Sequence, residues 1–195
     1  LTMGATMTEN RQANLEKAEQ HLTAAYGMRT FGKLTEIPYE QVFDVNQKMT
    51  CKELIFQIQY LQGDQIYSSS IARNNQARGE TINSRFPSTG LGGNVKMDLV
   101  KDYETNDLRK NYSIKFASSP QVNDWFITKF RDNSDAAGAQ GWGGNDWILI
   151  RYADVMLLLA EAKMHLGKDA EAITLLDEVR ERAGLPSYAT SIADA

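Results

Sequence analysis

Two carboxylates on one predicted helix are the first residues whose types and spacing could support catalysis. Asp154 and Glu161 lie seven positions apart, which is about 10 Å along a helix axis. Hydrolysis of a glycosidic bond needs two carboxyl groups about 5 to 10 Å apart across an open cleft. However, Arg151 lies one turn before Asp154 and can pair with it. We therefore interpret Arg151, Asp154 and Glu161 as a structural polar seam and assign no catalytic residue.

Two loop motifs resemble catalytic or nucleotide-binding motifs but lack an essential residue. The glycines between residues 138 and 144 precede a predicted helix, where a phosphate-binding loop would lie. Asp146 occupies the position of the third glycine, and its carboxylate would repel phosphate. Ser88 is not in a nucleophile elbow, because Phe86 stands where a glycine must relieve the strained turn. Neither motif predicts an enzyme.

Metal-binding residues are scarce in this sequence. Cys51 is the single cysteine, and His21 and His165 are the two histidines. A cysteine-rich zinc site and a three-histidine centre are therefore excluded. The acidic run at residues 132–135 resembles a calcium loop, but Ala136 occupies a ligand position, so we interpret these acids as solvated loop residues. We predict neither a metal nor a cofactor.

Aromatic side chains in or beside predicted loops are the remaining functional candidates. A planar ring can hold the apolar face of a sugar while neighbouring polar groups bond its hydroxyls, and several such contacts of about 1 kcal/mol must act together. Trp125 could equally be a core residue of a strand, and we expect Trp147 to pack in the interior. The candidates are Tyr67, Phe86, Trp125 and Trp142 for stacking, with Asn75, Arg78 and Asn145 for hydroxyl groups.

Composition excludes two further classes of function. The chain has 195 residues and a formal charge of -4, without a basic stripe, so binding to nucleic acid is not expected. The longest apolar stretch, residues 147–166, is interrupted by charged residues and is not a membrane span. The first residues lack a secretion signal, which we expect to have been removed or to lie outside this sequence.

Helical periodicity is clearest near the two ends of the sequence. Apolar residues recur every three or four positions over residues 9–26, with Thr8 as a possible cap and Gly27 as a left-handed end. Residues 146–166 predict a helix that is apolar on most sides and therefore buried, with Asp146 as its cap.

The second of these helices is followed closely by another. Gly167 is expected to end the first helix, Asp169 to cap the next and Gly184 to close it. Two helices joined by so short a turn predict an antiparallel hairpin of the tetratricopeptide kind.

The middle of the sequence predicts short strands and long loops. Alternation of apolar and polar residues predicts a half-buried strand over residues 52–60, and a hairpin over residues 112–116 and 125–130. Long loops are expected at residues 63–94 and 131–145, and a short helix near residues 95–103.

Two blocks in the C-terminal half resemble the SusD/RagB family. They are Arg-Tyr-Ala-Asp-Val at 151–155 followed by Ala-Glu-Ala at 160–162, and Val-Arg-Glu-Arg-Ala-Gly-Leu-Pro at 179–186. Weaker agreement extends over residues 38–43, 52–60 and 98–109. The resemblance implies a mainly α fold, in which tetratricopeptide-like helical hairpins carry a small β-hairpin and long loops. We expect residues 1–195 to be one such segment, with a helical scaffold at 9–26 and 146–184 and a loop- and strand-rich insert at 40–145.

The resemblance also implies a function. Proteins of this family are non-catalytic lipoproteins at the surface of the outer membrane, which capture oligosaccharides or polysaccharides and pass them to a TonB-dependent transporter. This sequence lacks the lipidated cysteine and the later Glu- and Arg-rich helix, so we interpret it as a segment truncated at both ends, whose only membrane attachment would be an absent N-terminal lipid anchor. The alternatives are a peptide-binding member of the family, a helical-repeat scaffold for protein interactions and, least favoured, a glycoside-processing enzyme.

Overall fold

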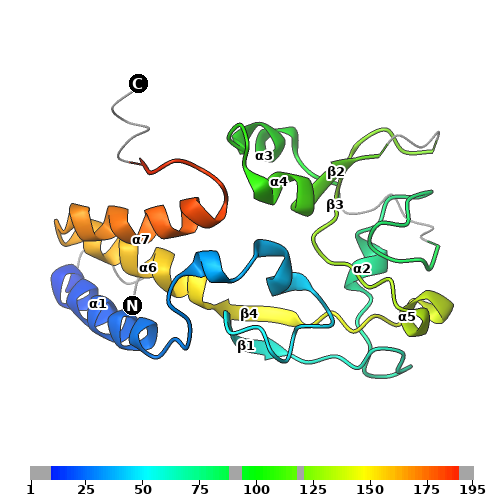
Figure 1. The fold of residues 1–195 in the computed structure, drawn as a ribbon, viewed down its shortest axis with the longest axis horizontal. Helices are drawn as coiled ribbons and strands as arrows, with labels where there is room; N and C mark the ends of the chain where they lie inside the picture. The colour runs from blue at the N-terminus through cyan, green and yellow to red at the C-terminus, as the bar shows by residue number, and fades with distance from the viewer. Residues whose placement is uncertain (1–9, 88–93, 118–120, 189–195) are drawn as a thin grey trace. The chain divides into compact units, whose positions relative to one another are not determined.

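The computed structural model describes residues 10–87, 94–117 and 121–188 (Figure 1). The chain forms two compact units. The first contains the residues up to 38, residues 52–56 and the residues from 150 onward, and the second contains residues 39–51 and 57–149. Each unit is therefore assembled from segments that are distant in the sequence.

Three helices form the first unit. They are α1 (Arg11–Gly27), α6 (Tyr152–His165) and α7 (Asp169–Arg182), and α6 packs against both α1 and α7 (Figure 1). The short helix η2 (Leu34–Glu36) also contacts α7. Small alanines let the helix axes approach closely, while larger side chains fill the space between them. The buried residues include Leu15, Ala18, Ala153, Met156, Leu159, Ala162, Ala172, Leu175 and Val179.

The predicted ends of these helices are partly correct. Gly167 and Gly184 adopt the left-handed conformation, with φ of 74° and 75°, and so end α6 and α7 as expected. Gly27 does not, because it is the last residue inside α1. Asp169 is the first helical residue of α7 rather than its cap. Thr8 and Ser88 lie outside the described residues.

The predicted helix over residues 146–166 is wrong in its first turn. Residues Trp147–Arg151 form strand β4, which pairs with β1 (Leu54–Ile58) in a two-stranded sheet. An aromatic and two isoleucines favour a strand here, and α6 begins only where a carboxylate oxygen of Asp154 accepts the backbone N–H of Arg151 at 3.2 Å. The continuous apolar run of residues 147–150 had concealed this change of structure.

The predicted burial of two elements also needs correction. In β1, Phe56 and Ile58 were expected to face inward, but their exposed fractions are 55% and 47%, whereas Glu53 just before the strand is fully buried. In α6, Leu157 and Leu158 are each 38% exposed, so this helix is not buried on all sides.

The second unit contains the predicted hairpin. Strands β2 (Ile114–Phe116) and β3 (Trp125–Ile127) pair antiparallel, with Phe116 opposite Trp125. The strand predicted from residue 112 begins later, because α4 (Leu108–Ser113) precedes it. The remaining elements of this unit are η3 (Tyr39–Phe43), α2 (Ile71–Asn74), α3 (Met97–Asp102) and α5 (Asp135–Gln140).

The two predicted long loops are thus interrupted by the short helices α2 and α5. Within the described ranges, no helix is both long and apolar enough to cross a membrane.

Candidate functional site

Hydrogen bonds fasten the two long loops to each other. The backbone N–H of Gly63 donates to the carbonyl of Trp142 at 2.9 Å, and Ser69 and Gly143 exchange two backbone hydrogen bonds of 2.6 and 2.9 Å. A guanidinium N–H of Arg73 donates to the carbonyl of Gln140 at 3.4 Å. We call residues 60–87 and 131–146 the joined loops, because these bonds hold them together as one surface.

Asp132 is the first anchor of the joined loops. Its carboxylate accepts hydrogen bonds from the side-chain amide of Gln62 at 2.9 Å, the backbone N–H of Gly144 at 2.7 Å and the hydroxyl of Ser134 at 2.7 Å. The expectation of a solvated loop acid is wrong for Asp132, which is buried, although it holds for the exposed Asp135. A buried carboxylate with these donors has a structural role.

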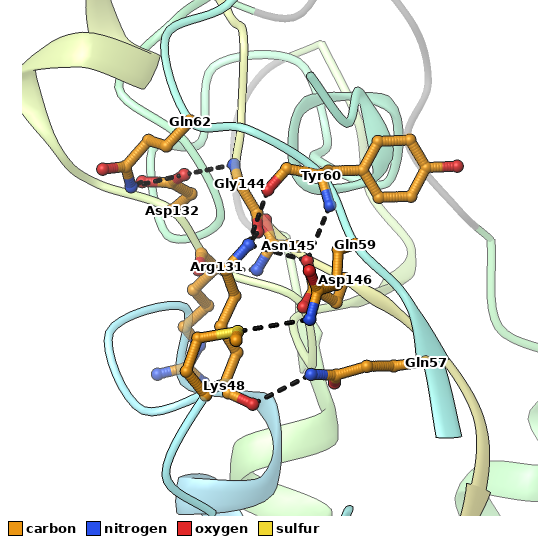
Figure 2. Close-up of polar contacts among 11 residues, drawn as sticks. Lys48, Gln57, Gln59, Tyr60, Gln62, Arg131, Asp132, Gly144, Asn145 and Asp146 are labelled. Atoms are coloured by element: carbon orange, nitrogen blue, oxygen red, sulfur yellow. Dashed lines mark hydrogen bonds and ion pairs between the residues drawn. The ribbon is translucent and has the colours of Figure 1, made fainter. Parts of the chain in front are cut away.

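Lys48 and Asp146 form the second anchor (Figure 2). The Lys48 ammonium donates to Asp146 Oδ1 at 2.7 Å and to the carbonyls of Tyr60 and Gly144 at 2.6 and 2.8 Å. Asp146 Oδ1 also accepts the backbone N–H of Tyr60 at 2.8 Å. All three ammonium hydrogens therefore have acceptors, and Asp146 is not the helix cap that the sequence predicted.

Gln76 fixes the segment that carries Phe86. Its buried side-chain oxygen accepts the backbone N–H groups of Asn83 and Ser84 at 3.0 and 2.8 Å, and its amide donates to the carbonyl of Phe86 at 3.3 Å. The Arg73 guanidinium lies 5.7 Å from the centre of the Phe86 ring. The Phe86 ring is thus held in place within the joined loops and is only half-buried.

Tyr67 projects from a well-defined turn. Its ring is exposed, with 63% of the residue accessible to solvent, and the neighbouring Ile66 and Leu61 are also exposed. The carbonyl of Tyr67 accepts the N–H of Leu61 at 2.8 Å. The backbone N–H groups of Tyr67 and Ile66 donate to Asp64 and hold the pKa of its carboxyl below the ordinary value. An ordered backbone therefore presents a solvent-facing ring.

Three of the candidate aromatic residues belong to the joined loops. Trp142 is half-buried, and its carbonyl bonds Gly63 in the turn that ends at Tyr67. A side chain at the neighbouring Gly141 would lie 2.9 Å from the Phe86 ring. The structure therefore brings Tyr67, Phe86 and Trp142 onto one set of loops.

The candidate polar residues are placed less favourably for a ligand. Asn145 is only 3% exposed, and its amide donates to the carbonyl of Arg131 at 3.0 Å, so its predicted role at the surface is replaced by a structural one. The side chain of Asn75 is half-buried and donates to the carbonyl of Ile71 at 2.8 Å. Arg78 is exposed.

Trp125 lies on the hairpin and not on the joined loops. Its ring meets the Phe116 ring at a centroid distance of 5.8 Å and an angle of 72°. It also packs against the buried cluster of Val95, Val100 and Ile114. The core interpretation of Trp125 therefore holds in part, because the partly buried residue packs on this cluster. The residue also lines a surface cavity, and its role in glycan binding stays a prediction.

The predicted polar seam is centred on a residue that the sequence analysis missed. Glu53 is fully buried and bonds Arg151 at 2.8 Å and Arg182 by a short contact, while Arg151 also lies 3.5 Å from Asp154. Glu161 is exposed and lines an apolar groove between α6 and α7 instead. Glu53 follows a charged lysine and lies just before a short strand, so the sequence carried no signal for its burial.

Among the residues that the structure describes, no group of three or more His, Cys, Asp or Glu side chains could hold an ion. The hydrogen-bonded loops carry the exposed ring of Tyr67 and the half-buried rings of Phe86 and Trp142, an arrangement that is suited to binding.

Comparison with known families and relatives gives one consistent result. The model of the SusD family matches residues 59–195. SusD-like protein P2 of Formosa agariphila is 28% identical over 179 residues, in an alignment that covers 78% of this chain and 34% of that protein. The chain therefore spans about a third of this curated relative.

Solved structures resemble the fold. A SusD superfamily protein from Parabacteroides distasonis has a TM-score of 0.73 at 19% identity, covering 96% of this chain and 42% of that one. Surface glycan-binding protein A from Bacteroides thetaiotaomicron, in complex with laminarihexaose, has a TM-score of 0.66 at 17% identity, covering 89% of this chain and 44% of that one. At these identities the likeness concerns the fold alone.

Proposed function

Because the chain belongs to the SusD family, we propose that it is part of a non-catalytic glycan-binding protein at the surface of the outer membrane. In this proposal it captures oligosaccharide and passes it to a TonB-dependent transporter. The match of the family model over residues 59–195 carries the proposal, and the solved relative with bound laminarihexaose supports a glycan as the ligand.

We assign the first contacts with the glycan to the joined loops. Tyr67 is exposed on an ordered turn, and Trp142 and Phe86 lie on the same loops. Rings of this kind stack on the apolar faces of sugars, and each stacked ring contributes about 1 kcal/mol beyond the area it buries. Three such contacts are consistent with millimolar to micromolar affinity.

A titration of tryptophan fluorescence tests this assignment. We expect a neutral glucan oligosaccharide such as laminarihexaose, or another member of an oligosaccharide panel, to change the fluorescence of the chain saturably. Tyr67→Ala should then weaken binding about fivefold to tenfold, since roughly 1 kcal/mol of stacking is lost.

Trp147→Ala is the matched control for loss of a large aromatic. Trp147 is half exposed and stacks on Phe130 at 6.5 Å, and both residues are outside the joined loops, so its removal should leave affinity within about twofold of the unchanged chain. Equal losses in both variants, or none in Tyr67→Ala, would contradict the assignment.

The transporter partnership needs a separate experiment. The protein should co-purify with a TonB-dependent transporter, and Tyr67→Ala should not disturb that complex while it weakens glycan binding. Association with the transporter but with peptides instead of glycans as ligands would favour the peptide-binding alternative.

A further inference from the structure

A cavity lies along the β2–β3 hairpin, and Ile82 and Arg131 of the joined loops also line it. Its volume is about 600 Å³, which is within the range of small-molecule sites, about 300 to 1,000 Å³. Phe116 and Trp125 form its aromatic part, and Asn111, Lys115 and Arg131 are among its polar residues. Phe116 remains 41% exposed, so a ring is accessible to a ligand.

The cavity has positively charged side chains and no acidic ones. Lys115 and Arg131 line it, and the Lys110 ammonium lies 6.0 Å from the centre of the Trp125 ring. No aspartate or glutamate lines the cavity within the described part of the chain. A chain with a formal charge of -4 thus gathers cations around one aromatic cavity, where they favour an anionic ligand.

The ion pairs found among the described residues involve other side chains than Lys110, Lys115 and Arg131. The hairpin acid beside the tryptophan, Asp124, instead accepts the backbone N–H of Trp125 at 2.7 Å.

Arg131 is held in position by neutral groups. Its guanidinium donates to the carbonyls of Thr128 and Tyr112 at 2.8 and 2.9 Å and lies 4.2 Å from the centre of the Tyr112 ring. These contacts orient the guanidinium through neutral groups. A positioned arginine of this kind suits a carboxylate or sulfate group.

We propose that this cavity binds an acidic sugar, in which a ring lies on Phe116 and Trp125 while its carboxylate or sulfate group meets Lys115 and Arg131. This inference rests on the proposed function and deepens it, because it names anionic oligosaccharides as the preferred ligand class. The joined loops would then bind the glycan through stacking, and the hairpin cavity would select its charge.

Calorimetric titration with matched ligands tests the proposal. The probes are trigalacturonate, its carboxyl-reduced neutral form and a sulfated trisaccharide, each at low and high salt. We expect at least one acidic ligand to bind about tenfold more tightly than the neutral form at low salt, and the difference to shrink at high salt because the charges are partly exposed. The carboxylate and sulfate arms identify which anionic group is preferred.

Substitution of Lys115, which lines the cavity, provides a second test of the proposal. Lys115→Ala should weaken the acidic ligand about threefold to tenfold and leave the neutral ligand unchanged. Lys101→Ala removes the same charge from an exposed position on α3 outside the cavity and should change neither affinity. Circular dichroism of both variants verifies that they fold.

Two results would overturn the inference, and they differ in what they mean for the proposed function. Equal affinity for acidic and neutral ligands, with no effect of Lys115→Ala, contradicts the acidic preference and leaves glycan binding intact. Binding of neither class contradicts both proposals.

Discussion

Glu53 shows how one buried side chain can organise the helical unit. Its carboxylate lies between the guanidinium groups of Arg151 and Arg182, and all three side chains are largely shielded from water. The two arginines belong to the blocks that resemble the family in sequence, whereas Glu53 lies about a hundred residues earlier. An ion pair of this kind contributes little compared with an apolar replacement, but loss of one partner leaves an uncompensated charge in the interior.

The first prediction therefore concerns Glu53→Gln. The guanidinium groups of Arg151 and Arg182 would lose the negative charge that lies between them, and we expect the free energy of unfolding to fall by about 3 kcal/mol, as measured by urea denaturation. Glu181→Gln is the matched control, because its pair with Lys33 at 3.6 Å is exposed, and it should cost less than about 0.5 kcal/mol. A similar small cost in both variants would contradict the central role of Glu53.

Gly141 matters at the residue scale for a different reason. It ends α5 with φ of 73°, and a Cβ there would lie 2.7 Å from Arg73 Cδ and 2.9 Å from the Phe86 ring. A side chain would therefore combine backbone strain with a clash in the joined loops.

We predict that Gly141→Ala lowers the free energy of unfolding by about 2 kcal/mol and weakens glycan binding. Gly27→Ala is the control, because Gly27 lies inside α1 with open space around it, and it should be neutral or stabilising by up to about 1 kcal/mol. Thermal unfolding of the two variants distinguishes these outcomes, and a stabilised Gly141→Ala would contradict the account of the loops.

At the scale of elements, the carboxylate of Glu19 links α1 to the helical hairpin. Glu19 on α1 accepts hydrogen bonds from Lys163 of α6 at 2.8 Å and from Lys168, in the turn before α7, at 2.7 Å. These two ammonium groups hold the pKa of Glu19 below its ordinary value of 4.5.

This lowered pKa predicts a pH-dependent contribution to stability. A carboxyl whose pKa is lower in the folded state stabilises the fold above its unfolded pKa, and the contribution is lost as the pH falls through the folded value. Glu19→Gln should thus lose about 1 kcal/mol at pH 7, and its difference from the unchanged chain should disappear as the pH falls from about 5 to about 3.

Urea denaturation across that pH range measures this effect. Glu16→Gln, an exposed position one turn earlier in α1, should differ from the unchanged chain by less than about 0.5 kcal/mol throughout. A difference for Glu19→Gln that is constant from pH 7 to pH 3 would contradict the ionic attachment of α1.

The elements also show what the sequence could predict. The helical hairpin and the β2–β3 hairpin were predictable because their apolar periodicity is local and their turns contain glycine or proline. Strand β4 was not, because its apolar run continues directly into α6 and periodicity cannot separate a buried strand from a buried helix over so few residues.

The candidate site depended on contacts that no local pattern reveals. Lys48 and Asp146 are 98 residues apart in the sequence, and Asp132 gathers partners from both joined loops. The exposed aromatic Tyr67 was predictable from its polar neighbours, whereas the burial of Asn145 follows from these distant contacts. Loop composition thus indicated where ligands could bind but not which polar groups remain available.

At the scale of the whole molecule, the chain spans less than half the length of the relatives that it matches. It covers 34% of one curated relative and 42% of a solved one. We assign different roles to its two units. Glu53 and Glu19 stabilise the helical unit, and the second unit carries the joined loops and the hairpin cavity.

The central claim is that this chain binds glycan and does not alter it. Isothermal titration with a panel of neutral and acidic oligosaccharides, followed by mass spectrometry of the recovered ligand, tests it most directly. We predict saturable heat for at least one oligosaccharide, which is recovered at its original mass. Cleaved sugar in the recovered ligand, or the absence of binding heat across the panel, would contradict the claim.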